Sequence, residues 1–192
     1  MTSNADLSNV LSLELPAWIC VDVETSGPNP SQYSLLSIGA CTFTQPRHTF
    51  YVELRPQSEA AVPEAMEINQ LSISELMEHG LAPAEAMQRF EEWVLQVVPA
   101  GRKPVFVAFN APFDWMFIND YFLRFLGRNP FGHSALDIKA YYMGKTGKSW
   151  AETSMRAINR QIPAAGPLSH HALQDAIDQA VLFEAILKQP LD

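Results

Sequence analysis

The sequence predicts a single α/β domain built on a mixed β-sheet flanked by helices. The chain has 192 residues, of which 47% are hydrophobic and 18% are charged, and these values are typical of one globular domain with a sizeable core. Three strand-like runs come first, and amphipathic helices interrupted by two further strand-like runs follow, which indicates a sheet and the helices that cover it. No repeat or linker divides the chain.

The first strand is predicted at Trp18–Thr25, an apolar and β-branched run of the kind that forms a buried central strand. Residues 1–15 are polar with scattered leucines, so we expect a flexible, partly ordered tail followed by one domain over residues 16–192. The tail has no basic region followed by an apolar stretch and is therefore not expected to be a signal peptide. Strands at Ser34–Thr44 and Thr49–Leu54 complete an antiparallel meander.

The second part of the chain alternates helices with two short strands. Apolar runs predict the strands, which are Pro104–Phe109 and Ala135–Ile138. Amphipathic periodicity and early prolines predict the helices. These are Pro63–Leu71 with a continuation at Ser74–His79, Pro83–Val97, Asn110–Leu126, a helix ending at Met143, Trp150–Arg160 and His171–Lys188.

Asp22 and Glu24 are the most informative feature of the chain, because they place two carboxylates inside the otherwise apolar first strand. Residues i and i+2 of a strand point to the same side of the sheet. Two like charges at the edge of a core repel each other and resist the loss of water. A divalent cation held by oxygen ligands commonly offsets that cost, so the pair is a candidate half of a metal site.

Three further acids could complete such a site. Asp114 follows the fourth strand near the start of a helix, where ligands often bind, although the same acid could serve only the helix dipole. Asp175 lies beside the apolar face of the last helix, and Asp178 fits that face equally well. Helix geometry alone leaves the choice between Asp175 and Asp178 open.

His170 and His171 stand at the entrance to the last helix, and histidine is the natural general base near neutral pH. His171 and Asp175 are four residues apart and share a helix face. His170 is five residues before Asp175 and could reach it only from a loop or a cap. The spacing alone therefore favours His171.

Composition limits the partners of the chain. The formal net charge of −8 argues against binding long duplex nucleic acid through many phosphate contacts, although it permits action on a short strand or a chain end. No apolar run approaches the ~20 residues that span a membrane. Cys20 and Cys41 fall in strand-like segments, which favours buried free thiols and a cytoplasmic location.

Four segments together resemble the DEDDh family of 3'-5' exonucleases, the superfamily of ribonuclease T, oligoribonuclease and polymerase proofreading subunits. The motifs are Asp22-Val-Glu24, Asn110-Ala-Pro-Phe-Asp114 and His170-His-Ala-Leu-Gln-Asp175, and the strand at 34–40 is similar to the second strand of the family. Each motif alone is weak, but their order along nearly the whole chain makes a strong joint signal. The resemblance implies a ribonuclease H-like fold with a five-stranded mixed sheet.

The resemblance also implies a site. It makes Asp22, Glu24, Asp114 and Asp175 the ligands of two Mg²⁺ or Mn²⁺ ions. It assigns the general base to His170 rather than His171, because the motif places Ala172 two positions after the histidine. It makes Asp137 a structural acid. Substrate contacts are implied for Thr25, Ser26, Ile68, Asn69, Asn110 and Phe113.

The expected function is a metal-dependent 3'-5' exonuclease that releases nucleoside 5'-monophosphates from single-stranded nucleic acid or short oligonucleotides by a two-metal-ion mechanism. The small size, the acidity and the lack of an evident basic patch favour RNA or short oligonucleotides, and a homodimer is the assembly common among such relatives. The alternatives are a catalytically silent nucleic-acid or protein binding module on the same fold, and a phosphodiesterase for small nucleotides.

Overall fold

The computed structural model describes residues 17–164 and 169–190, so the predicted tail at residues 1–15 lies outside the described residues. Five strands form one mixed sheet in the order β3-β2-β1-β4-β5. They are β1 Ala17–Thr25, β2 Leu35–Thr42, β3 Thr49–Glu53, β4 Pro104–Ala108 and β5 Ala135–Asp137. The first three strands form the predicted antiparallel meander, while β4 and β5 run parallel to β1. The predicted α/β class and five-stranded mixed sheet are confirmed.

The helices of the described chain agree closely with the amphipathic pattern. They are α2 Pro63–Asn69, α3 Ile73–His79, α4 Pro83–Val97, α5 Ala111–Leu126, α6 Ile138–Thr146, α7 Met155–Gln161 and α8 Ala172–Lys188. The helix expected over Trp150–Arg160 is instead divided into the 3-10 turn η1 Trp150–Glu152 and α7, because the Ser154 hydroxyl caps a new helix by accepting from the backbone N–H of Ala157. None of the described helices is long and apolar enough to cross a membrane.

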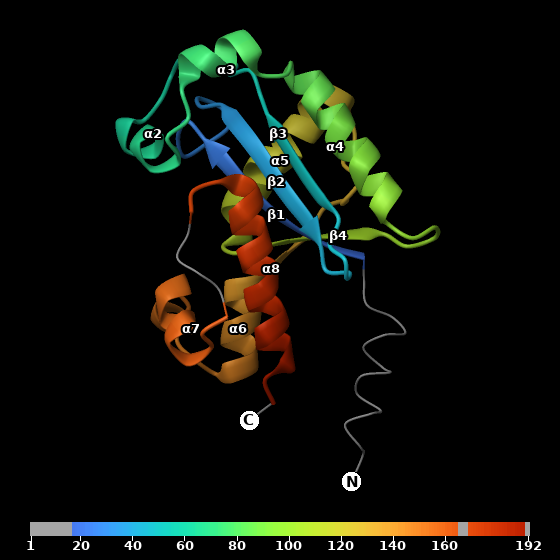
Figure 1. The fold of residues 1–192 in the computed structure, drawn as a ribbon, viewed down its shortest axis with the longest axis vertical. Helices are drawn as coiled ribbons and strands as arrows, with labels where there is room; N and C mark the ends of the chain where they lie inside the picture. Colours follow the sequence, from blue (N-terminus) through green and yellow to red (C-terminus); the bar gives the residue numbers. More distant parts are fainter. Residues whose placement is uncertain (1–16, 165–168, 191–192) are drawn as a thin grey trace.

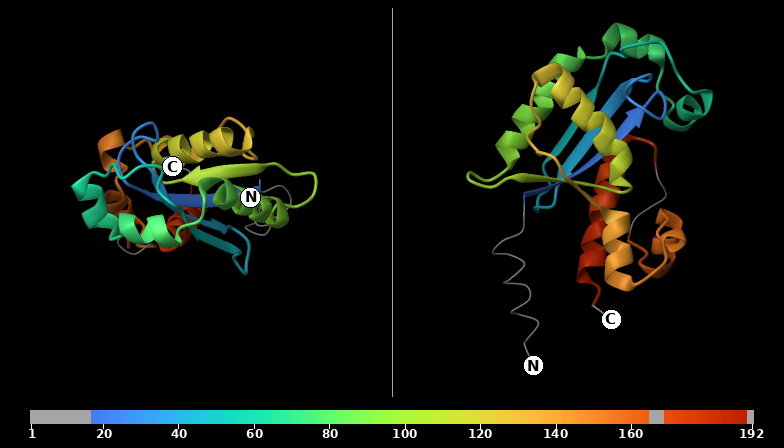
Figure 2. Two further views of the ribbon diagram at one scale, coloured as in Figure 1. Left: turned by 90° about the horizontal axis from the view of Figure 1, so that it is seen from above. Right: turned by 180° about the vertical axis from the view of Figure 1, so that it is seen from behind.

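Helices cover both faces of the sheet. Alternate residues Ile19, Val21 and Val23 of β1 join one core cluster with side chains of α4 and α5, whereas Cys20 joins a second cluster beneath α8. Figure 1 shows α8 in front of the strands, and the view from behind in Figure 2 shows α5 over the opposite face. The period of two along β1 therefore directs Asp22 to the α8 side of the sheet, together with Cys20.

The first turn of α8 lies directly on β2 at Gly39, which pairs with Asp22 across the sheet. A Cβ atom at Gly39 would overlap the backbone of Ala172 and Leu173. Glycine is therefore required here for close approach, and this approach brings the start of α8 next to the carboxylates of β1.

Candidate active site

The four predicted carboxylates converge where β1 and β4 end. Asp22 and Glu24 lie in the second half of β1, while Asp114 and Asp175 lie in the first turns of α5 and α8. Oxygen atoms of Asp22, Glu24 and Asp175 all lie within 4.8 Å of one another. Asp114 lines the same pocket outside this compact group, and its Oδ1 accepts a hydrogen bond of 3.1 Å from the backbone N–H of Val23.

The pocket around these acids has a volume of about 180 Å³, and we call it the acidic pocket. It is lined by Asp22, Val23, Glu24, Phe109, Asn110, Phe113, Asp114, His170, Asp175 and Gln179. The predicted substrate residues Asn110 and Phe113 therefore line the acidic pocket. Phe113 packs against Phe117 with ring centres 5.6 Å apart. Asn110 has a left-handed backbone with φ of 65°, an arrangement that asparagine tolerates better than most residues.

Burial and the repulsion of neighbouring carboxylates disfavour the charged forms of Asp22, Glu24 and Asp114. Burial, followed by the charges of Asp114, Glu24 and Asp175, raises the pKa of Asp22 well above its ordinary range. Burial and the Asp175 charge raise the pKa of Glu24 to about 7. Burial also raises the pKa of Asp114, although backbone N–H donors, including that of Val23, act against it. A cation between the carboxylates would reverse each of these effects.

Gln179 is a site residue that the sequence analysis missed. Its Nε2 donates to Oδ1 of Asp22 over 2.7 Å, and its Oε1 accepts from the backbone N–H of Phe109 over 2.8 Å. One buried side chain therefore joins α8 to the ends of both β1 and β4. Its position four residues after Asp175 is the signal that could have identified it, because residues i and i+4 share a helix face.

His170 is held beside the acids by its backbone. The N–H of His170 donates to Oδ2 of Asp175 over 2.9 Å, and the N–H and hydroxyl of Ser169 donate to Oδ1 over 2.7 and 2.9 Å. His170 has a φ of 56°, in the left-handed region, and it lines the acidic pocket. His171 instead stacks on Tyr51 of β3, with ring centres 4.6 Å apart.

The other predicted substrate residues surround the end of β1 without lining the acidic pocket. The hydroxyls of Thr25 and Ser26 donate to the carbonyls of Gly27 and Ala60, and both residues are buried. Asn69 donates from Nδ2 to the carbonyl of Thr25, which fixes α2 beside β1. Ile68 is 51% exposed on the adjacent surface of α2.

Asp137 is placed as a structural acid. Its Oδ1 accepts from the backbone N–H groups of Asn110 and Lys139, which caps α6 and holds the turn after β4. Asp137 is not part of the compact group that Asp22, Glu24 and Asp175 form among the described residues.

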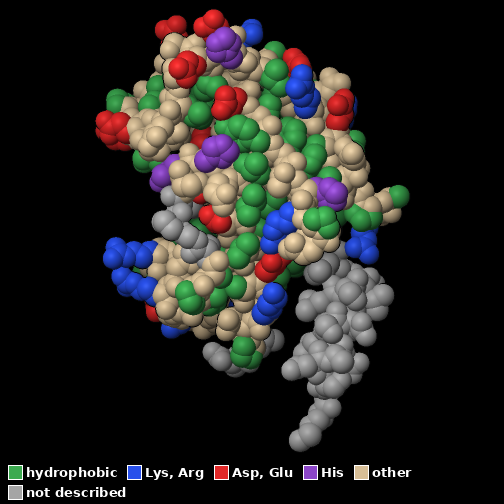
Figure 3. All heavy atoms as spheres, in the orientation of Figure 1, with side chains coloured by type: hydrophobic (Ala, Val, Ile, Leu, Met, Phe, Trp, Pro, Cys, Tyr) green, Lys and Arg blue, Asp and Glu red, His purple; other side chains and the backbone are tan. Residues whose placement is uncertain are grey.

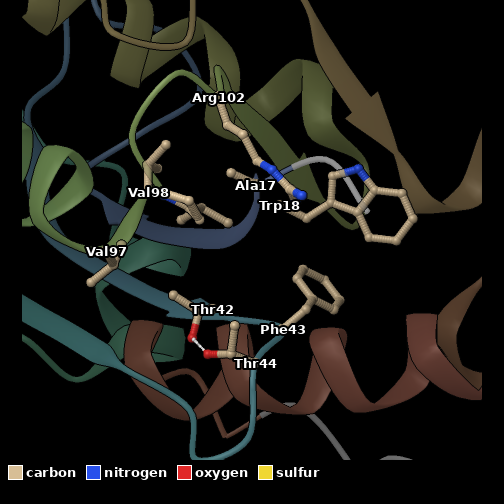
Figure 4. Close-up of a pocket in the computed structure, with 10 residues that line it drawn as sticks. Ala17, Trp18, Thr42, Phe43, Thr44, Val97, Val98 and Arg102 are labelled. Carbon is tan, nitrogen blue, oxygen red and sulfur yellow. Dashed lines mark hydrogen bonds between the residues drawn. The ribbon is translucent and has the colours of Figure 1, made fainter. Parts of the chain in front are cut away.

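A second pocket, of about 250 Å³, lies at the opposite end of β1 and is shown in Figure 4. Trp18, Phe43, Val97 and Val98 give it apolar walls, and the Thr42 and Thr44 hydroxyls hydrogen-bond to each other at its edge. Among the described residues that line it, none is an acid or a histidine. The smaller acidic pocket therefore holds the groups that can bind metal and transfer protons.

Known proteins resemble this chain in sequence and in fold. A family model described as a 3'-5' exoribonuclease Rv2179c-like domain matches residues 18–187. The 3'-5' DNA exonuclease Cap18 of Escherichia coli is 48% identical over 171 residues, which cover 89% of this chain and 91% of Cap18. Ribonuclease T of Salmonella typhimurium is 26% identical, over 98% of this chain and 93% of that enzyme.

Solved structures show the same fold. The nuclease domain of 3'hExo, a DEDDh family member bound to rAMP, superposes with a TM-score of 0.77 at 11% identity, covering 93% of this chain and 95% of that domain. Exonuclease I of Escherichia coli, in complex with an oligonucleotide, has a TM-score of 0.68 at 18% identity, covering 92% of this chain and 42% of that protein.

Proposed function

We propose a reaction for this chain, which belongs to the family of 3'-5' exoribonuclease Rv2179c-like domains and is a 3'-5' exonuclease of the DEDDh type. It releases nucleoside 5'-monophosphates from the 3' ends of single-stranded nucleic acid with two divalent cations. The observation that carries the proposal is the group of Asp22, Glu24 and Asp175, whose oxygens lie within 4.8 Å of one another beside Asp114 and His170.

The carboxylates suit Mg²⁺ or Mn²⁺. Both ions prefer oxygen ligands, and the raised pKa values of Asp22 and Glu24 are the effect expected of acids brought together without a compensating positive charge. Asp22, Glu24, Asp114 and Asp175 would hold the ions. When bound, the ions would lower the pKa of an attacking water and neutralise charge on the scissile phosphate and the departing 3' oxygen.

The protein supplies the base and the orientation. An imidazole nitrogen of His170 accepts a proton from the attacking water, and the backbone bond to Asp175 holds the ring at the acidic pocket. Gln179 keeps Asp22 fixed relative to the end of β4. The exposed Ile68 and the side chain of Phe113 offer apolar surface for the terminal base.

For the substrate we propose single-stranded DNA ends, with RNA as the second candidate. The name of the relative that is 48% identical over 89% of the chain supports DNA. The description of the family model and the expectation from the acidic composition support RNA. Assembly as a homodimer is a further part of the proposal, and light scattering would test it.

The central experiment uses paired 5'-labelled DNA and RNA oligomers of one sequence with Mg²⁺, Mn²⁺ or EDTA. We expect stepwise shortening from the 3' end, release of 5'-monophosphates and no reaction in EDTA. Asp22→Asn should abolish the reaction while the protein remains folded, whereas Asp178→Asn, on the same helix as Asp175 but outside the acidic pocket, should retain it. Near-normal activity of Asp22→Asn would overturn the metal assignment.

A further inference from the structure

An exposed tryptophan and a lysine adjoin the acidic pocket. Trp150 begins η1 and is 52% exposed. The ammonium nitrogen of Lys139 lies 4.4 Å from the centre of the Trp150 ring. The same nitrogen lies 3.5 Å from Oδ1 of Asn110 and 6.0 Å from the centre of the Phe109 ring. Because Phe109 and Asn110 line the acidic pocket, Trp150 lies one side chain beyond its rim.

Among the ion pairs of the described residues, none joins Lys139 to a carboxylate. A single exposed apolar side chain would need no explanation by itself. A half-exposed aromatic ring with an ammonium group held over it, however, offers what one nucleotide of a single strand requires. The base can stack on the exposed part of the ring, and the phosphate can pair with the cation.

The surrounding segment is basic although the chain is acidic. Residues 138–162 form α6, η1 and α7, and we call this segment the basic lobe. It contains one acid, Glu152, and is net positive in a chain with a formal charge of −8. Its five cations are Lys139, Lys145, Lys148, Arg156 and Arg160. This bias lies in one continuous stretch of the sequence, but the acidic composition of the whole chain, on which the expectation of no evident basic patch depended, conceals it.

The side of the acidic pocket that lies away from the basic lobe is negatively charged. Residues 56–88, which include α2 and α3, contain six glutamates and neither lysine nor arginine. Figure 3 shows acidic side chains over the α2 and α3 region and basic side chains gathered over α7. A polyanion whose 3' end occupies the acidic pocket is therefore repelled on the α2 side and attracted over the basic lobe.

We propose that the basic lobe binds the strand on the 5' side of the scissile phosphate, with Trp150 stacking on a base and Lys139 pairing with a phosphate. The inference rests on the proposed function, because it takes the 3' end to lie in the acidic pocket. Arg156 and Arg160 extend the same surface along exposed positions of α7 and attract the phosphates that follow. The lobe thus sets the preference for substrate length, whereas the acidic pocket performs the cleavage.

The test compares a dinucleotide with an oligomer of about ten nucleotides of the same base. Trp150→Ala should lower kcat/KM on the longer oligomer by about 10-fold to 100-fold, the usual range for losing one stacked base, and leave the dinucleotide rate unchanged. Trp150→Phe should restore most of the loss. Lys139→Ala should weaken binding and reduce the slope of log affinity against log salt by about one. The matched controls are Leu95→Ala and Lys103→Ala, exposed residues of the same classes outside both the pocket and the lobe.

A binding measurement in EDTA makes the inference independent of catalysis. Fluorescence anisotropy of a labelled oligomer should show weaker binding to Trp150→Ala and Lys139→Ala than to wild type and the two controls. If wild type cleaves no oligomer but this pattern of binding is observed, the proposed function is wrong and the basic lobe is still a strand-binding surface. Equal loss on dinucleotide and long oligomer, or unchanged binding in both variants, would overturn the assignment of the lobe.

Discussion

Replacing Glu24 by glutamine should stabilise the metal-free protein, and the gain should grow as the pH rises. In the folded protein, burial and the Asp175 charge raise the pKa of Glu24 to about 7 from an ordinary value of 4.5. A folded-state pKa above the unfolded value means that the stabilising contribution of the group is fully present below about pH 4.5 and is lost as the pH rises through about 7. The ionised acid is thus the destabilising form.

The magnitude follows from the shift. One pKa unit corresponds to about 1.4 kcal/mol, so raising the pH from about 5 to about 7 should cost wild type on the order of 2–3 kcal/mol through Glu24 alone. Glutamine has nearly the same shape and no charge to gain over this range. The free energy of unfolding of Glu24→Gln minus that of wild type should therefore increase by about this amount.

Urea denaturation in EDTA at a series of pH values measures the difference directly. Glu67→Gln, an exposed position of α2, controls for the loss of one negative charge from an acidic protein. Adding Mg²⁺ near pH 8 should stabilise wild type more than Glu24→Gln, because ions that bind only the folded state shift the unfolding equilibrium. A difference between Glu24→Gln and wild type that stayed constant from about pH 5 to about pH 8 would refute the reasoning.

Three further substitutions test the frame around the acids. Gln179→Glu should lower kcat by about 10-fold to 100-fold, because it replaces the donor to Asp22 with a negative charge, while Gln174→Glu on the same helix should not. Gly39→Ala should lower the free energy of unfolding, measured by urea denaturation, by about 1–3 kcal/mol and should lower kcat, because a Cβ atom would push α8 away from β2. Gly144→Ala is the control, since a Cβ atom there meets nothing within 4 Å. His170→Ala should lower kcat by about 10²-fold to 10⁴-fold, and a larger loss in His171→Ala would reverse the assignment of the base.

The central strand could be predicted because its pattern has a single interpretation. A period of two and a buried, β-branched environment place Asp22 and Glu24 on one side whatever the rest of the fold does. The early proline of α5 and the position of Asp114 after β4 were equally local signals. These elements needed no knowledge of the partner segments.

The choice between neighbouring residues could not be predicted from periodicity. Asp175 and Asp178 satisfy the same helical pattern, and only the packing of α8 on Gly39 decides which one lies near β1. His170 depends on a left-handed backbone and His171 on stacking against Tyr51, and neither follows from side-chain spacing. Only the motif had favoured His170 over His171.

Asp175 joins the metal-binding and proton-transfer parts of the proposed mechanism. Its two oxygens accept hydrogen bonds from Ser169 and His170, and one of its oxygens also belongs to the compact acidic group. An amide at position 175 would present an N–H group to at least one of these donors, so Asp175→Asn would displace the histidine as well as remove a ligand. Asp22→Asn lacks this contact with the loop and therefore separates loss of metal binding from loss of the base.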